Sequence, residues 1–381
     1  MRKLMMFMVA ALWWIPAQAT VVAADRPAEY LPLLADKNVA LVVNQTSRVG
    51  DQHLVDFLLE NDVNVVKVLA PEHGFRGDAG AGETISDAVD TRTGLPILSI
   101  YGKTKKPSAE MLAGVDTIIF DIQDVGARFY TYISTMHYVM EAAAEQGLAM
   151  IVLDRPNPNG AYVDGPVLDL EFQSFVGMHE IPLLHGMTVG ELALMIKGEG
   201  WIKAADELAL TVVPVSDYQR DEAYALPIAP SPNLPNAQAI QLYPSLCLFE
   251  ATAVSIGRGT EFPFQVMGHD EVPLGEFSFT PRSLPQSAPT PKLQDQQLYG
   301  VDLRKSEVRG FDLSLLLEAH QAFKEAGVTF FTAPDFMDKL SGTDKLRKAI
   351  EAGQSEAEIR ASWQPALTQF KQRRAPYLLY P

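Results

Sequence analysis

The stretch VVKVLAPEHGFRG, residues 65–77, carries the strongest signal for the fold. Its β-branched apolar run stops at Pro71, which predicts a buried strand that ends in a glycine-flanked loop. The loop begins with Glu72 and His73, a carboxylic acid next to an imidazole. Because ligands of open parallel sheets bind just beyond the carboxyl ends of the strands, the pattern favours a functional loop. The alternative is a carboxylate and a histidine that only brace the loop.

The N-terminus has the composition of an export leader. A basic pair, Arg2 and Lys3, precedes an apolar run over residues 4–15, and residues 17–19, Ala-Gln-Ala, have the form of a signal peptidase site. We expect a leader over residues 1–24, or one that ends at Ala19, and a periplasmic mature protein. No later stretch approaches the roughly 18 consecutive apolar residues of a membrane span, so no integral membrane segment is expected after leader removal.

Composition sets the class of the mature chain. The 381 residues, 47% of them hydrophobic, can form two domains with substantial cores. Without Arg2 and Lys3 the 31 basic residues become 29 against 47 acids, a net charge of −18, which makes nucleic acid a poor partner. Cys247 is the only cysteine, so no intramolecular disulfide can form and stability must come from the core.

Apolar runs and amphipathic segments alternate along the first two thirds of the chain. Strands are predicted at 38–47, 63–70, 95–100, 116–122, 149–153 and 208–215, and helices at 51–61, 108–113, 129–146 and 189–197. This alternation is typical of an α/β fold with a Rossmann-like parallel sheet. The proline-dense run LPIAPSPNLP, residues 226–235, predicts a junction between a catalytic domain over 25–230 and an α+β domain over 231–381, with helices at 312–326 and 342–352.

Five predicted strands end in polar side chains. These residues are Asn44, Glu72, Tyr101, Asp121 or Asp124, and Asp154 with Arg155. Because parallel strands present their carboxyl ends at one edge of the sheet, we expect these side chains to form a single site. No G-x-G-x-x-G follows the first strand, so neither a dinucleotide nor any other cofactor is predicted.

The strand ends are rich in carboxylates, which favours general acid/base chemistry of the kind that glycosidases use. Glu72 is the first candidate for the acid, and Glu83, Asp121 and Asp124 compete for the second carboxylate role. The plainer interpretation of Asp121 and Asp124 is that they stabilise the N-terminus of the helix that follows at Phe129.

Other chemistries have weaker signals. His73, His179 and His185 could hold a metal ion with Asp121 or Asp124, but no spacing places two ligands on one helix face, and no metal is predicted. The sequence contains no G-x-S-x-G motif, which argues against a serine hydrolase of the kind that carries its nucleophile on that turn. The turn Gly257-Arg258-Gly259 can present an arginine to an anionic group.

Several motifs in a fixed order resemble a known family. They are PEHGFRG (71–77), Gly82-Glu83, FDIQDVGARFYTY (120–132), DRPNPNG (154–160), LLHGMTVGELA (183–193) and SIGRGTEFPF (255–264). From about Asn38 to the C-terminus, the chain resembles the NamZ-type exo-β-N-acetylmuramidases. The resemblance implies a Rossmann-like catalytic domain and a family-specific C-terminal domain. It also implies release of N-acetylmuramic acid from the non-reducing ends of peptidoglycan fragments.

The resemblance places the catalytic glutamates at Glu72 and Glu83. We expect Arg128, Arg155 or Arg258 to pair with the lactyl carboxylate of muramic acid. The remaining expected substrate contacts are Asn44, His73, Tyr101, Asp154 and His185. Retaining, inverting and substrate-assisted courses stay open at this point, the last with Asp121 or Asp124 orienting the acetamido group.

The non-enzymatic alternative is a periplasmic protein that binds muropeptides or glycans in a cleft between two domains. Such a protein does not require an acid at Glu72, so Glu72→Gln would leave its affinity unchanged.

Overall fold

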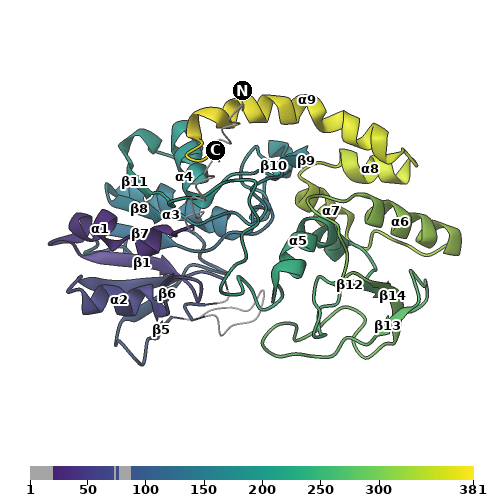
Figure 1. Ribbon diagram of the computed structural model, residues 1–381, viewed down its shortest axis with the longest axis horizontal. Helices are drawn as coiled ribbons and strands as arrows, with labels where there is room; N and C mark the ends of the chain where they lie inside the picture. The colour runs from purple at the N-terminus through teal and green to yellow at the C-terminus, as the bar shows by residue number, and fades with distance from the viewer. Residues whose placement is uncertain (1–19, 73, 77–86) are drawn as a thin grey trace, which may run out of the picture.

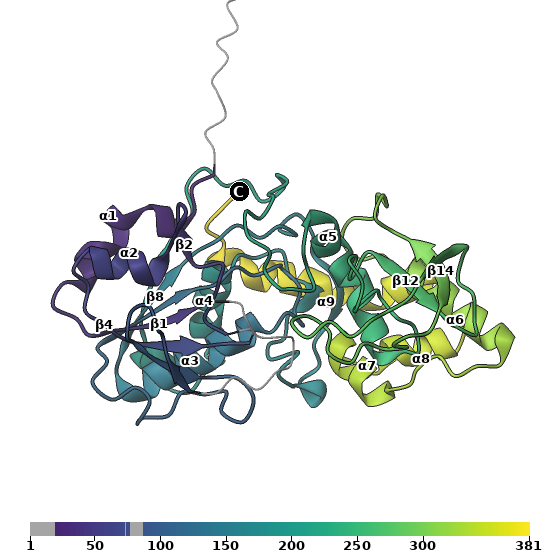
Figure 2. The same ribbon diagram turned by 90° about the horizontal axis from the view of Figure 1, so that it is seen from below.

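The computed structural model describes residues 20–72, 74–76 and 87–381. Figures 1 and 2 show two lobes, an N-terminal domain that contains the first described residues and the large sheet, and a C-terminal domain that begins with α5 (Ala237–Leu246). The N-terminal sheet contains β1 (Val39–Val43), β4 (Val65–Ala70), β5 (Ala88–Val89), β6 (Pro96–Ser99), β7 (Thr117–Asp121), β8 (Ala149–Leu153) and β11 (Ala209–Val213). Its helices are α1 (Pro27–Tyr30), α2 (Leu54–Glu60), α3 (Tyr132–Gln146) and α4 (Val189–Gly198).

The strand order of the large sheet is β11-β8-β7-β1-β4-β6-β5. All neighbours pair in parallel except β5, which runs antiparallel to β6 at the edge. Numbered by their order in the chain, the six parallel strands read 3-2-1-4-5-6 from β6 to β11, which is the order of Rossmann sheets. The predicted α/β class with a Rossmann-like parallel sheet is confirmed.

Both faces of this sheet are buried, which explains why its strands read as continuous apolar runs. In β1, Ala40 and Val42 belong to the core that α3 and α4 cover, whereas Leu41 and Val43 belong to the core beneath α2. Thr188 and Glu191 form a capping box at the start of α4. The segment at 108–113 forms turns instead of the expected helix.

The first described residues belong to the folded domain. Val21 pairs with Ser216, and Ala23 and Ala24 are fully buried. A leader that extended to Ala24 would therefore include side chains of the core. Among the described residues, no helix is both long and apolar enough to cross a bilayer.

The loops after β1 and β7 close the crevice in which Rossmann sheets bind dinucleotides. This crevice lies where the strand order reverses, between the first and fourth strands. Here the Ser47 hydroxyl donates to the Asp121 carbonyl, and the Gln123 amide donates to the Thr46 hydroxyl at 3.0 Å. The Gln45 side chain binds the carbonyls of residues 229–230. The loops at this switch point are therefore hydrogen-bonded to each other and to residues 229–230.

Short antiparallel strands and five helices complete the described chain. Two small hairpins of the N-terminal domain are β2 (Arg48–Val49) with β3 (Gln52–His53), and β9 (Asp164–Val167) with β10 (Pro182–Leu184). The C-terminal domain has the sheet β12-β14-β13, made of β12 (Val266–His269), β13 (Phe277–Phe279) and β14 (Leu298–Asp302). Its helices are α5 (Ala237–Leu246), α6 (Ser314–Ala326), α7 (Pro334–Ser341), α8 (Lys345–Glu351) and α9 (Glu356–Arg374).

The last helix connects the two domains. Figure 1 shows α9 running from the C-terminal domain, beside α8, back to the N-terminal domain beside α4. Near its start, Arg360 donates to the Phe311 carbonyl and pairs with Asp164 at 2.7 Å. At its end, Arg374 donates to the carbonyls of His185 and Gly186 at 2.9 and 2.7 Å. The chain therefore crosses between the domains twice, once before α5 and once along α9.

Candidate active site

Glu72 lies two residues beyond the end of β4, where two hydroxyl groups hold its carboxylate. The Tyr101 hydroxyl, after β6, donates to Glu72 Oε1 at 2.9 Å, and the Thr131 hydroxyl, before α3, donates to Oε2 at 2.9 Å. The Tyr132 hydroxyl donates to the Glu72 carbonyl at 3.3 Å. Burial and the neighbouring Glu72 carboxylate raise the pKa of Tyr101, so its hydroxyl remains a donor. Two segments of the chain, at Tyr101 and at 131–132, thus fix the orientation of one acid.

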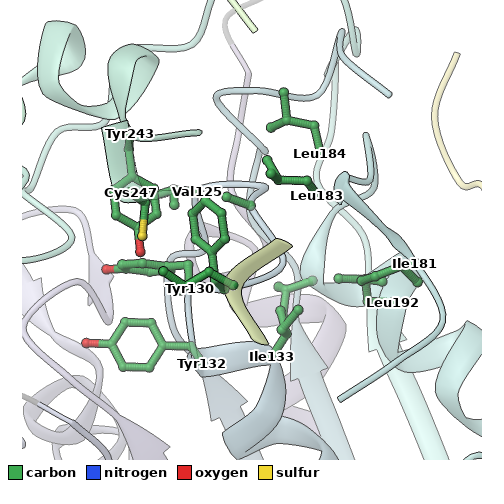
Figure 3. Close-up of a cluster of buried hydrophobic side chains, with 14 of the residues drawn as sticks. Val125, Tyr130, Tyr132, Ile133, Ile181, Leu183, Leu184, Leu192, Tyr243 and Cys247 are labelled. Carbon is green, nitrogen blue, oxygen red and sulfur yellow. The ribbon is translucent and has the colours of Figure 1, made fainter. Parts of the chain in front are cut away.

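Aromatic side chains form the floor beside this acid. Figure 3 shows Tyr130 and Tyr132 one beside the other, with Tyr243 and Cys247 of α5 and the following turn next to them. The rings of Tyr130 and Tyr132 meet edge to face with centroids 5.1 Å apart, and those of Tyr130 and Tyr243 at 5.8 Å. Tyr243 also packs against Phe264 at 5.0 Å. Since both domains supply rings, the floor also joins them.

Arg258 and Glu250 line the same cavity as Glu72 and form an ion pair in its wall. The guanidinium Nε of Arg258 pairs with Glu250 Oε1 at 2.6 Å, and the guanidinium carbon lies 5.0 Å from the Phe264 ring centre. Burial lowers the pKa of Arg258, but Glu250 outweighs burial and the net shift is upward. Among the described residues, the two terminal amino groups of Arg258 have no hydrogen-bond partner. These donors are available to an anion in the cavity.

The turn that carries Arg258 requires glycine on both sides. Gly257 and Gly259 have φ of 80° and 81°. A Cβ at Gly257 would lie 2.8 Å from the Phe262 carbonyl oxygen, and one at Gly259 would lie 2.5 Å from the Arg282 carbonyl oxygen. The sequence Gly-Arg-Gly is therefore the local reason that the arginine reaches the cavity.

Lys292 supports the segment that presents Glu250. Its ammonium group donates to the carbonyls of Phe249, Glu250, Thr252 and Val254, at the end of the turn that follows α5. Burial lowers the pKa of Lys292 to about 8. The Lys292 ammonium group thus stabilises the backbone of this segment and does not line the cavity.

Both domains line one cavity of about 250 Å³. Glu72, Tyr101, Thr131 and Tyr132 lie on the N-terminal side. Tyr243, Cys247, Glu250, Arg258 and Phe264 lie on the C-terminal side. The lining also includes Asn233, in the segment before α5, and Phe175, Val176, Phe336 and Leu340. A volume below the usual range of drug-sized sites suits one small polar unit.

Three residues that the sequence singles out meet in this cavity: Glu72, Tyr101 and Arg258. His73 and Glu83 lie outside the described residues. The roles of all five remain predictions, but the geometry supports those of the first three.

Asp121, Asp154 and Arg155 lie at the expected edge of the sheet but are buried beneath the loops. Asp121 receives both Nε and Nη2 of Arg155, at 2.5 and 2.9 Å, and the carboxylate raises the pKa of the guanidinium against the effect of burial. Asp154 accepts hydrogen bonds from Thr188 at 2.7 Å and from Tyr380 at 2.5 Å. All three side chains therefore have structural partners within the fold, and the expected catalytic role of Asp121 and substrate contacts of Asp154 and Arg155 remain predictions.

Arg128 is also a structural residue. It is fully buried, and its guanidinium donates to the carbonyls of Pro166, Ile181 and Leu340. Because these partners come from both domains, Arg128 stabilises their junction. The structure thus leaves Arg258 as the arginine that can meet a carboxylate in the cavity.

Asn44, Asp124 and His185 are buried as well, and none of them lines the cavity. Asn44 accepts the amide of Thr46 at 2.9 Å, and His185 Nδ1 accepts the amide of Met187 at 3.2 Å. The geometry of this cavity therefore does not support their expected contacts with substrate or the catalytic role of Asp124, and these remain predictions. The described residues contain no group of three or more His, Cys, Asp or Glu side chains placed to hold a metal ion.

Asp124 makes stability depend on pH. Burial raises the pKa of its carboxyl from 3.8 to about 7, while Oδ2 accepts the Gly126 amide at 2.7 Å. The folded state therefore holds this proton more tightly than the unfolded state, and the contribution to stability falls as pH rises from about 4 to about 7.

Asp124→Asn keeps the neutral form at every pH. We expect the difference in free energy of unfolding between the variant and the parent to rise by roughly 3 kcal/mol, in favour of the variant, as pH increases from 5 to 8. Thermal unfolding at several pH values would measure this difference, with Asp206→Asn, at an exposed position of a short 3-10 helix, as the control. Parallel pH profiles for the parent and Asp124→Asn would contradict the assignment.

Sequence reasoning missed half of the cavity. Thr131 and Tyr132 fall inside the helix predicted at 129–146, whereas the observed α3 begins at Tyr132, and Glu250 and Phe336 have no neighbours of diagnostic spacing. The FYTY run at 129–132, with three aromatic rings before a helix, was the available signal. The arrangement pairs one oriented acid with a cation across an aromatic floor, which suits acid/base chemistry on a small anionic substrate.

Comparisons with known proteins match the whole fold. The family models of exo-beta-N-acetylmuramidase NamZ match residues 39–238 with the N-terminal model and 241–380 with the C-terminal model. The peptidoglycan beta-N-acetylmuramidase NamZ of Bacillus subtilis (strain 168) is 40% identical over 374 residues, covering 92% of this chain and 89% of that protein.

Two crystal structures of DUF1343 family proteins from Bacteroides fragilis NCTC 9343 superpose on the chain. One is 45% identical with a TM-score of 0.86, the other 29% identical with a TM-score of 0.82. Each alignment covers 95% of this chain and 99% of the other. Sequence and structure therefore agree across both domains, and the chain belongs to the NamZ family of exo-β-N-acetylmuramidases, which are glycosidases.

Proposed function

We propose that the chain is an exo-acting glycosidase that removes N-acetylmuramic acid from the non-reducing ends of peptidoglycan fragments, with Glu72 as its acid/base residue. The observation that carries the proposal is the Glu72 carboxylate, held by Tyr101 and Thr131 in the cavity that Arg258 shares. The NamZ relative of Bacillus subtilis is named for this class of activity. A cavity of about 250 Å³ suits one terminal sugar.

Glu72 acts on the bond that joins the terminal sugar to the rest of the fragment. Its carboxylic acid form gives a proton to the glycosidic oxygen as the bond from that oxygen to the anomeric carbon breaks. Water then supplies the new hydroxyl group of the released sugar, and its proton returns to the protein. Tyr101 and Thr131 hold the carboxyl in place during this transfer, because each binds a different oxygen.

Arg258 is proposed to receive the lactyl carboxylate, the group that distinguishes muramic acid from glucosamine. Its two terminal amino groups lack partners among the described residues, and Glu250 fixes the guanidinium through Nε. A guanidinium that is held in this way can donate two parallel hydrogen bonds to a carboxylate. The same arrangement gives no benefit to a neutral substrate.

The experiment that tests the function is release of 4-nitrophenol from the β-glycoside of N-acetylmuramic acid, beside the matching N-acetylglucosamine glycoside. We expect kcat/KM for the muramic glycoside to exceed that for the glucosamine glycoside on the order of 100-fold or more. If neither glycoside is hydrolysed while muropeptides still bind, the chain is a binding protein and the proposal fails.

Arg258→Ala is expected to lower kcat/KM for the muramic glycoside on the order of 100-fold, because a charge-assisted pair in a partly buried site is lost. Activity on the glucosamine glycoside should change little, so the ratio of the two constants reports the role of the arginine. Arg258→Lys is the matched control, since it keeps a cation beside Glu250 and should retain part of the selectivity. An unchanged ratio in Arg258→Ala would remove this residue from substrate recognition.

We also propose that the protein acts in the periplasm after cleavage behind Ala19. The leader-like composition of residues 1–19 and the burial of Ala23 and Ala24 support this boundary, because cleavage after Ala24 would remove side chains of the core. The intact mass of protein from the periplasmic fraction would distinguish the two boundaries.

A further inference from the structure

Two phenylalanines from different domains line the cavity that contains Glu72. Phe175 comes from the loop between β9 and β10, where Ser174 pairs with Gly177, and Phe336 comes from the first turn of α7. Phe336 is 38% exposed, although Met337 and Leu340 of the same helix are buried. A large apolar ring is thus kept in contact with water beside the acid.

The Phe175 ring packs against three neighbouring side chains. It stacks on Tyr138 with an interplanar angle of 16° and lies 6.2 Å from the Tyr101 ring. The Lys105 ammonium lies 4.5 Å from its ring centre. Because Tyr101 binds Glu72, this cluster places a rigid apolar edge beside the acid.

The Phe336 ring, in contrast, has no aromatic or cationic partner within the described part of the chain. Of the eight large apolar side chains that are exposed in the described residues, Phe336 alone lines the cavity with Glu72. Its exposed ring is therefore available to a ligand that extends out of this cavity. The other exposed apolar side chains lie away from the cavity and cannot contact such a ligand.

We infer that Phe336 contacts the aglycone, the sugar whose oxygen departs when the terminal muramic acid is released. This inference rests on the proposed function. If the terminal sugar fills the cavity, the next sugar must lie at its edge, and the C–H face of a pyranose is an apolar surface that suits an aromatic ring. Burying both surfaces favours the bound fragment over a free monosaccharide derivative. Phe336 is thus a specificity-determining residue that ranks substrates by the group attached to the terminal sugar.

Two substrates separate the aglycone contact from the chemistry of the terminal sugar. The disaccharide of N-acetylmuramic acid β-linked to N-acetylglucosamine has a sugar aglycone, and β-N-acetylmuramyl fluoride has none. For Phe336→Ala we expect kcat/KM for the disaccharide to fall on the order of tenfold while that for the fluoride stays within about twofold. Phe336→Trp should restore the disaccharide constant. Tyr299→Ala, an aromatic residue on β14 that is 40% exposed and does not line the cavity, is the matched control.

The two substrates also separate this inference from the proposed function. Hydrolysis of the fluoride by the parent protein reports the function, and the ratio of the two constants reports the aglycone contact. Equal losses on both substrates in Phe336→Ala, or no loss on either, would overturn the aglycone contact while the function stands. A parent protein that hydrolyses neither substrate would overturn both.

Discussion

Glu72→Gln should lower kcat/KM for the natural disaccharide by about 10³-fold or more, because the variant cannot transfer a proton to the departing oxygen. The amide keeps the size of the carboxyl group and can still accept a hydrogen bond from Tyr101 or Thr131. The thermal midpoint should therefore stay close to that of the parent. This change is the largest effect on activity that we expect from a single substitution.

The leaving group shows whether Glu72 acts as the acid. The 2,4-dinitrophenolate group of a 2,4-dinitrophenyl glycoside departs as a stable anion and does not need a proton. Glu72→Gln should therefore lose far less activity on this substrate than on the disaccharide. Equal losses on both substrates would assign Glu72 to another step. Glu110→Gln, an exposed position before β7, should change neither constant and controls for the substitution itself.

The Glu72 position could be predicted because the signal is local. The apolar run of β4 and the acid that follows it are adjacent in sequence, and parallel pairing then places Tyr101 after β6 beside it. The turn around Arg258 is local as well, since two glycines with positive φ frame the arginine. Such features depend on few residues, and the residues that define them are neighbours in the chain.

The buried strand ends could not be separated from the exposed ones in the same way. Asp154 and Arg155 follow β8 just as Glu72 follows β4, but the partner that covers Asp154 is Tyr380, 226 residues away. Arg128 is likewise hidden by the carbonyl of Leu340, 212 residues away. A polar residue at a strand end can line a cleft or brace a loop, and distant partners decide between the two.

The helix α9 is not predicted from the sequence, because its composition is unusual for a helix that packs on a core. Pro365 lies inside it and most of its side chains are charged or polar. Its buried residues Ile359, Trp363, Leu367 and Phe370 nevertheless follow helical spacing, so the periodicity was present in the sequence. This helix returns the C-terminus to the N-terminal domain, and the two domains are therefore less independent than a single boundary near residue 230 implies.

Deletion of residues 375–381 should cause the largest loss of stability, because this segment covers two buried carboxylates of the N-terminal domain. The Tyr380 hydroxyl donates to Asp154 Oδ2 at 2.5 Å, and the Leu379 amide donates to Glu191 Oε1 at 2.7 Å. Arg220 pairs with Glu191 and also donates to the Tyr380 carbonyl at 3.0 Å. Asp154 and Glu191 are both fully buried, so the loss of a donor leaves each of them less well compensated.

We expect the thermal midpoint of the truncated protein to fall on the order of 10 °C, with a smaller fall for Tyr380→Phe, which loses only the hydroxyl. Leu379→Ala is the matched control, since the Leu379 side chain is exposed while its backbone amide still reaches Glu191. A midpoint that does not change on truncation would show that α9 alone holds the domains together. A fall in the midpoint for Tyr380→Phe but not for Leu379→Ala would instead assign the stability to the buried carboxylates, because the hydroxyl is the group that Asp154 loses.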